Sequence, residues 1–101
     1  MADIVVLPAL VDYVAQQDAR TKKLFDKQKK FMEMNPFYPS LGRKTLTNVK
    51  DRYGNVLFEI RLNIHRRIIC LEKNNKIYWL KLTTHDEIKR NNIISIDGWS
   101  G

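Results

Sequence analysis

The second half of the chain alternates apolar and polar residues, as β-strands do. In "NVLFEIRL" (55–62) the residues Phe58, Ile60 and Leu62 fall on one side of the strand, while Glu59 and Arg61 fall on the other. The segments "HRRIICLE" (65–72) and "KIYWLKLT" (76–83) predict two more strands. Between them, the adjacent asparagines of "EKNNK" tolerate the left-handed backbone of a hairpin turn. We therefore expect an antiparallel meander of three strands.

The first half of the chain reads as a short strand followed by two helices. "DIVVL" (3–7) is short, β-branched and apolar, which predicts a strand at one edge of the sheet. From residue 9 to residue 35 the apolar residues recur at the three-to-four spacing of a helix. Asp18 and Thr21 are predicted caps at a break, so this segment forms an αα-hairpin. The prolines and glycine of "NPFYPSLG" (35–42) end the second helix.

Together these elements predict an α+β fold in two layers, with the N-terminal strand and the αα-hairpin packed on the antiparallel meander. The length supports a single domain, residues 1–101. Thr84 and Glu87 have the spacing of a capping box, which predicts a short helix to about Arg90. Residues 92–101 contain "IISI", and we expect them to form either an edge strand or a flexible tail.

Composition and charge restrict the classes of function. Lys and Arg number 18 against 11 Asp and Glu, a formal net charge of +7, which points to a polyanion or an acidic protein as partner; the alternative is a merely soluble basic surface. Cys70 is the single cysteine, so a disulfide framework and a cysteine-based zinc site are excluded, and the sequence indicates neither a metal nor a cofactor. No apolar run is long enough for a membrane span, so we expect a cytoplasmic protein.

Candidate functional side chains lie opposite the apolar stripe of the meander. Strand alternation places them on one surface, and neighbouring strands are only about 4.8 Å apart, so they are expected to converge on one concave patch. The members of this set are Arg61, Arg67, Lys81 and His85. Several cations and an imidazole together suit a site that grips a nucleic-acid backbone or stabilises a phosphoryl transition state.

Three of these assignments have alternatives. His85 follows a strand end and is either a catalytic acid or an incidental imidazole beside a helix cap. Trp79 has the same parity as Lys81 and is either a base-stacking platform or a core residue. Arg66 and Arg67 are adjacent in a strand and therefore face opposite ways, so only one of them points into the patch.

The order of elements resembles the RelE/ParE superfamily of toxins from type II toxin–antitoxin systems. The segments that carry the resemblance are "LGRKTL" (41–46), which looks like the family's basic connector, and "LFEIRLNIHRRIICLEKNNKIYWLKLTTHDEI" (57–88). The close of the second segment, "KLTTHDEI", resembles the YafQ-like branch. Cys70 departs from the pattern, since many relatives carry an aromatic residue there, and residues 92–101 run farther past the histidine than YafQ-like chains do.

The resemblance implies a ribosome-dependent mRNA endonuclease, or mRNA interferase, that inhibits translation. In this family the ribose 2′-hydroxyl attacks the neighbouring phosphate without a metal or cofactor. The residues that match the family's catalytic positions are Lys44, Arg61, Arg67 and His85. Further nucleic-acid contacts are implied at Lys81, His65, Arg66 and Arg43. The implied partners are an acidic antitoxin and mRNA on the ribosome, with no membrane.

Two other functions stay open at this point. A ParE-like toxin would bind DNA gyrase without cutting RNA, and His85 would then have no chemical role. A basic nucleic-acid-binding module would have no toxic effect at all.

Overall fold

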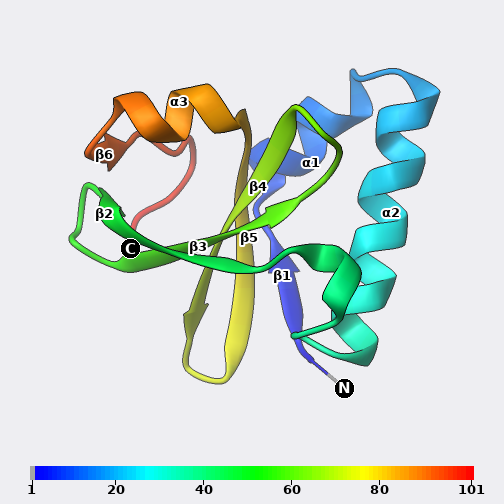
Figure 1. Ribbon diagram of the computed structural model, residues 1–101, viewed down its shortest axis with the longest axis horizontal. Helices are drawn as coiled ribbons and strands as arrows, with labels where there is room; N and C mark the ends of the chain where they lie inside the picture. The colour runs from blue at the N-terminus through cyan, green and yellow to red at the C-terminus, as the bar shows by residue number, and fades with distance from the viewer. Residues whose placement is uncertain (1) are drawn as a thin grey trace.

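A computed structural model describes residues 2–101 and contains a six-stranded sheet with three α-helices (Figure 1). The elements in chain order are β1 (Ile4–Val6), α1 (Pro8–Ala15), α2 (Ala19–Met34), the 3-10 turn η1 (Pro39–Leu41), β2 (Lys44–Asp51), β3 (Val56–Arg61), β4 (Arg66–Lys73), β5 (Lys76–Thr84), α3 (His85–Arg90) and β6 (Ile93–Ile94). The predicted α+β class is confirmed. None of the helices in residues 2–101 is long and apolar enough to cross a membrane.

The strand order of the sheet is β1-β5-β4-β3-β2-β6. Its centre is the predicted antiparallel meander β3-β4-β5, and the predicted edge strand β1 pairs in parallel with β5. The residues after α3 also contribute a strand, because β6 pairs in parallel with β2 at the opposite edge. Both outer strands are therefore supplied by the ends of the chain.

Local sequence signals place the helix starts and the hairpin turn. The Asp18 carboxylate accepts a hydrogen bond from the Thr21 amide at 2.8 Å, which caps α2 as predicted. The Thr84 hydroxyl accepts one from the Glu87 amide at 3.2 Å and caps α3. Between β4 and β5 the two asparagines of the turn have φ angles of 55° and 63°, the left-handed conformation expected for them.

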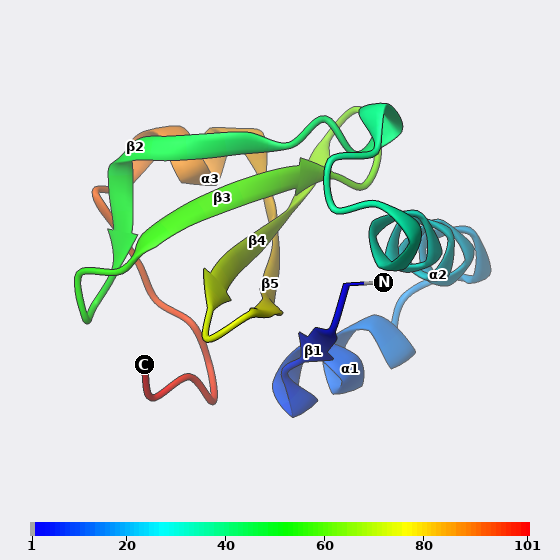
Figure 2. The ribbon, with the colours of Figure 1, turned by 90° about the horizontal axis from the view of Figure 1, so that it is seen from below.

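Strand β2 was not predicted, because residues 41–46 were interpreted as a connector. The burial of β2 does not alternate: Leu46 and Val49 are its buried apolar residues and lie three apart. The pairing with β3 shifts register between Thr45 and Lys50, so an irregularity interrupts the period of two. Figure 2 shows β2 bending sharply along its length. A bent strand of mostly polar residues carries little periodic signal.

Helices α1 and α2 cover one face of the sheet. Trp79 on β5 is fully buried there and meets Phe25 of α2 edge to face, with ring centroids 5.1 Å apart. Its indole N–H points at the Met32 sulfur, 3.1 Å away. Trp79 is therefore a core residue, and the alternative of a base-stacking platform is wrong.

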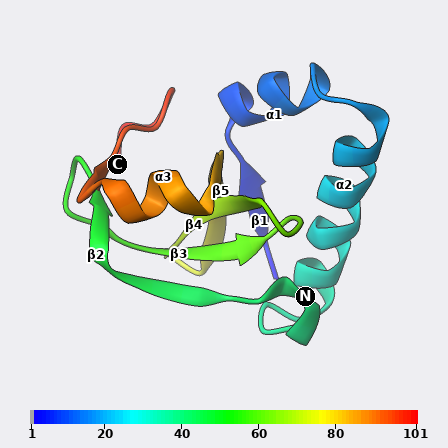
Figure 3. The ribbon, with the colours of Figure 1, turned by 45° about the horizontal axis from the view of Figure 1, so that its top comes forward.

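The other face of the sheet is partly covered as well, which the two-layer prediction did not include. Helix α3 leaves the end of β5 and leads to β6 at the far edge, so it crosses this face (Figure 3). Ile88 of α3, Ile94 and Ile96 are all buried. Residues 93–94 thus form an edge strand, and the segment after Arg90 contributes to a second apolar layer.

Candidate functional site

The strand register brings basic residues of several strands onto the face that α3 crosses. Arg61 pairs with Arg67, and Arg67 pairs with Thr83. Side chains of directly paired residues point to the same face of a sheet. These three residues therefore form one row across β3, β4 and β5, and the two arginines are direct neighbours within it.

A second row lies one pair farther along the same strands. Lys44 on β2 pairs with Glu59, which pairs with Ile69, which in turn pairs with Lys81. Glu59 and Arg61 are two residues apart on β3, so both rows occupy one face. We call Lys44, Arg61, Arg67 and Lys81 the basic face. Their placement on one surface follows from the register.

Arg67 is fixed by the turn that precedes its strand. Its guanidinium donates to the carbonyl oxygens of Asn63 at 2.9 Å and Arg66 at 3.0 Å, and the side chain is half-buried. Within residues 2–101 neither Arg67 nor Arg61 forms an ion pair with an acidic side chain. Like charges directly opposite on neighbouring strands are destabilising, so this arrangement favours binding of an anion between them.

Arg61 is exposed at the end of β3, beside Gly42. Gly42 has a φ of 59°, a conformation that side chains other than glycine and asparagine rarely adopt. A Cβ atom at Gly42 would lie 3.6 Å from the Cβ of Arg61. The glycine therefore allows the chain to turn from η1 into β2 close to the arginine.

Lys81 and Thr83 are linked to the segments after β5. The Lys81 ammonium donates to the Ser95 carbonyl oxygen at 2.8 Å, and the Thr83 hydroxyl bonds to the Glu87 carboxylate of α3. The sequence placed Lys81 on the same face as Trp79, which is wrong. Ile69 pairs with Lys81 and Cys70 with Trp79, so Leu80 is an extra residue and the two side chains face opposite ways.

His85 is the first residue of α3 and is half-buried. Its Nδ1 atom is buried and has no hydrogen-bond partner among the described residues. A buried N–H without an acceptor is costly, so the neutral ring is best accommodated with a bare Nδ1 and a proton on Nε2. In this tautomer Nε2 carries the hydrogen and can donate a hydrogen bond, whereas transfer of a proton requires the imidazolium form.

Glu59 belongs to this face but was not among the candidate residues of the sequence. The residue is 5% exposed, and its Oε2 atom has no hydrogen-bond partner in the described structure. Buried carboxylates are normally paired or fully hydrogen-bonded, so an unpaired oxygen calls for an explanation. The sequence shows that Glu59 is two residues from Arg61 and therefore on the same face of the strand. Its burial depends on segments far away in the sequence and was not predictable.

Three other candidates lie away from the basic face. His65 is exposed in the turn between β3 and β4. Arg66 faces the opposite way from Arg67, as predicted, and its guanidinium donates to the Gln17 side chain at 2.9 Å.

Arg43 is on the helix-covered side of the sheet. Its guanidinium stacks on the Phe58 ring at 3.9 Å and forms an ion pair with Glu72 at 2.9 Å. The structure thus separates Arg43 from its neighbour Lys44.

Cys70 offers no nucleophile. The thiol is fully buried in the core, and burial raises its pKa well above the ordinary value. It is therefore protonated at neutral pH and inaccessible to a substrate.

Comparison with known proteins identifies the fold. No protein-family model and no curated protein sequence matches this chain. Among solved structures, RelE from the archaeal RelE–RelB complex of Pyrococcus horikoshii OT3 has a TM-score of 0.63 at 18% identity, over 82% of this chain and 93% of that one. The YoeB–YefM complex from Staphylococcus aureus has a TM-score of 0.59 at 17% sequence identity, over 84% of this chain and 98% of the other. The YoeB/ParE toxin from Agrobacterium tumefaciens has a TM-score of 0.60 at 12% sequence identity, over 82% of this chain and 98% of the other. The chain has the fold of the RelE/ParE toxins.

Proposed function

We propose that this chain is the toxin of a type II toxin–antitoxin system and acts as a ribosome-dependent mRNA endonuclease in the cytoplasm. The observation that carries the proposal is the pair of directly opposed arginines, Arg61 and Arg67, on a face that also holds Lys44. Neither arginine is neutralised by an acidic side chain within residues 2–101. The fold of RelE and YoeB toxins supports the same function.

The proposed reaction needs no metal. The ribose 2′-oxygen attacks the adjacent phosphorus while the bond from phosphorus to the 5′-oxygen breaks, leaving a 2′,3′-cyclic phosphate and a 5′-hydroxyl. A base must accept the proton of the 2′-hydroxyl, and an acid must give a proton to the departing 5′-oxygen. Cations must stabilise the negative charge that develops on the phosphoryl oxygens.

Each role has a candidate on or beside the basic face. Arg67, which is held by backbone carbonyls, and Arg61 stabilise the phosphoryl oxygens. Lys44 is exposed and guides the RNA backbone, as the resemblance implies. The imidazolium form of His85, which the negative charge of bound RNA favours, supplies its Nε2 proton to the 5′-oxygen and becomes neutral.

Glu59 is the candidate base, because it pairs with Lys44, lies two residues from Arg61 on the same strand, and has a carboxylate oxygen without a hydrogen-bond partner among the described residues. The sequence offered His85 as a catalytic acid, and Glu59 is proposed here as the separate base.

An antitoxin is the proposed protein partner. The similar structures include complexes named RelE–RelB and YoeB–YefM, each of a toxin with its partner. The net charge of +7 favours an acidic antitoxin here.

Primer extension on translating ribosomes tests the proposal. The wild-type protein should cut message at the ribosome, and Arg67→Ala and His85→Gln should each reduce the rate about 10²–10³-fold with the fold retained. Because Arg67 also holds a turn, Arg67→Lys provides a second variant that keeps the charge and loses the fixed geometry.

The exposed Arg52 at the far end of β2 is a matched control, and Arg52→Ala should cut normally. Unchanged cleavage in both Arg67→Ala and His85→Gln would refute the assignment.

Glu59→Gln separates a chemical role from a structural one. Loss of the base should lower kcat and change the pH profile of cleavage, with the binding of uncleaved message retained. A purely structural role would instead lower the melting temperature and leave the pH profile unchanged.

A ParE-like action on DNA gyrase is the second candidate, because a structure named YoeB/ParE toxin has the same fold. In that case expression would block DNA supercoiling rather than translation, and His85→Gln would leave toxicity unchanged. Harmless overexpression would instead favour a basic nucleic-acid-binding module.

A further inference from the structure

Part of the β5 edge has no strand beside it. Strand β1 pairs only with residues 77–79, and its last backbone bond runs from the Leu7 amide to the Trp79 carbonyl at 3.0 Å. Pro8 follows and has no N–H to continue the ladder. Residues 80–84 of β5 pair with β4 on one side, and no backbone bond reaches them from the other side within residues 2–101.

The extra residue Leu80 marks the point where pairing stops. A bulge bends its strand and increases the local twist, and this one falls directly after Trp79, the last residue of β5 that pairs with β1. Free strand edges are usually covered or blocked, since their N–H and C=O groups form a template for another strand. Residues 80–84 contain no proline, and no strand within residues 2–101 covers them on this side.

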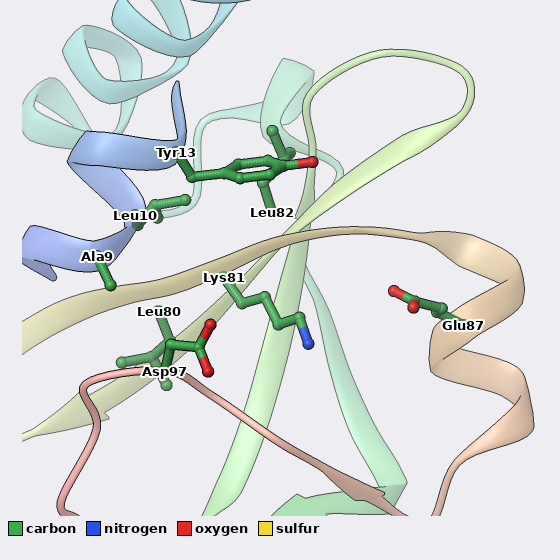
Figure 4. Close-up of a pocket in the computed structure, with 8 residues that line it drawn as sticks. All are labelled: Ala9, Leu10, Tyr13, Leu80, Lys81, Leu82, Glu87 and Asp97. Carbon is green, nitrogen blue, oxygen red and sulfur yellow. The ribbon is translucent and has the colours of Figure 1, made fainter. Parts of the chain in front are cut away.

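A groove follows this free edge. Two adjoining hollows, of about 260 Å³ and 270 Å³, have Tyr13, Leu82 and Glu87 in common. In Figure 4 Leu10 and Tyr13 of α1 lie along one side of β5, while Glu87 and Asp97 lie along the other. The groove thus has an apolar wall and a charged wall.

We propose that residues 80–84 of β5 accept an extended segment of a partner protein as an added antiparallel or parallel strand. In the proposed function this partner is the antitoxin, so the inference rests on that function for the identity of the partner. The backbone of the segment pairs with the free edge. Its alternate side chains meet the apolar wall at Tyr13 and the polar side chains at Lys81.

Charge selects among such segments. The groove itself carries both signs, with Lys81 and Arg66 against Glu87 and Asp97. The protein as a whole carries +7, which attracts an acidic chain over longer distances. The expected segment therefore alternates apolar residues with acidic ones.

Synthetic decapeptides of alternating valine and glutamate provide the probe. Added to the full chain, they should bind and slow amide hydrogen exchange at residues 80–84. An otherwise identical peptide with N-methyl groups at alternate residues keeps the side chains and loses the strand hydrogen bonds, so it should not bind. A valine–lysine peptide should bind more weakly.

Tyr13→Glu places a charge in the apolar wall and should weaken peptide binding at least tenfold. Tyr53→Glu is its matched control, because Tyr53 is 51% exposed against 48% for Tyr13 and lies outside the groove. Peptide binding with unchanged affinity in Tyr13→Glu would overturn the proposal.

Three further results would also overturn it: no binding at millimolar peptide, equal binding of the N-methylated peptide, or protection of residues 80–84 by raised protein concentration alone. The last would make a second copy of this chain the occupant. Ribosomal cleavage is measured separately without peptide, so failure of the nuclease function and failure of strand addition are distinguishable.

Discussion

The segment after α3 is held to the sheet by a buried carboxylate. Asp51, at the end of β2, is 2% exposed and accepts four hydrogen bonds: from the Tyr53 amide at 3.0 Å, from the Asn55 amide and side chain at 2.8 Å each, and from the Trp99 indole at 2.7 Å. The first three are local to the β2–β3 turn. Of these four bonds, the one from Trp99 connects the turn to residues 91–101.

Trp99→Phe removes this one donor and keeps an aromatic ring against Tyr78, whose centroid is 5.5 Å from that of Trp99. A hydrogen bond to a charged group contributes about 1.5–3 kcal/mol, so we expect the free energy of unfolding to fall by that amount at pH 7. In an Asp51→Asn background the same change should cost at least about 1 kcal/mol less, because the charged acceptor is already absent.

The loss of unfolding free energy in Trp99→Phe should depend on pH. Burial raises the pKa of Asp51, but hydrogen bonds from Asn55 and Trp99 outweigh it, so the pKa lies below its ordinary value. A carboxyl with a lowered pKa adds stability that is present above the unfolded-state pKa and is lost as pH falls through the folded-state pKa. The difference between wild type and Trp99→Phe should therefore be full near neutral pH and shrink in acid.

Urea unfolding at several pH values measures these differences. Tyr53→Phe is the control, since it removes only an exposed 3.4 Å bond to the Trp99 carbonyl and should cost no more than about 0.5 kcal/mol. Hydrogen exchange of the Lys50 amide, which donates to the Asn92 carbonyl at 3.0 Å, reports local release of the segment. A Trp99→Phe protein with unchanged stability and unchanged exchange at Lys50 would refute the reasoning.

Three further predictions concern the core, the hairpin and α3. The Cys70 thiol should resist thiol reagents at pH 8 in the native protein and react after addition of denaturant, because burial raises its pKa and blocks access; rapid native labelling would contradict this. Asn75→Ala should cost about 1–2 kcal/mol in urea unfolding, since its φ is 63°, whereas Asn75→Gly should be neutral or stabilising. Thr84→Ala should lose about 1 kcal/mol and speed hydrogen exchange in α3, while Thr84→Ser keeps the cap; equal exchange in the two variants would argue against the cap.

The features predicted correctly from the sequence depend on residues close together in the chain. The caps at Asp18 and Thr84 and the left-handed turn before β5 each involve only a few neighbouring residues. Strand β2 was missed because its bend interrupts the alternation on which the prediction depends. Its place in the sheet is decided by pairing with β3 and β6, which no local pattern encodes.

The candidate site was predictable as far as strand parity holds. Parity placed Arg61 and Arg67 on one face, and their pairing confirms this placement. The same rule wrongly placed Trp79 on the face of Lys81, because Leu80 is an extra residue between them in β5 and reverses the alternation of side chains. The position of Arg43 on the other side of the sheet was also not predictable, since its partner Glu72 lies far away in the sequence.

The parallel pairing of β1 with β5, and of β2 with β6, has a consequence for the nascent chain. Each early strand must wait for a partner that is translated much later, so the contacts that close the sheet span long stretches of sequence. Ile94 completes the last of these pairs. A ribosome that has not yet delivered this residue holds a chain whose sheet still lacks its last strand pair, so the sheet cannot close before residues 93–94 are available.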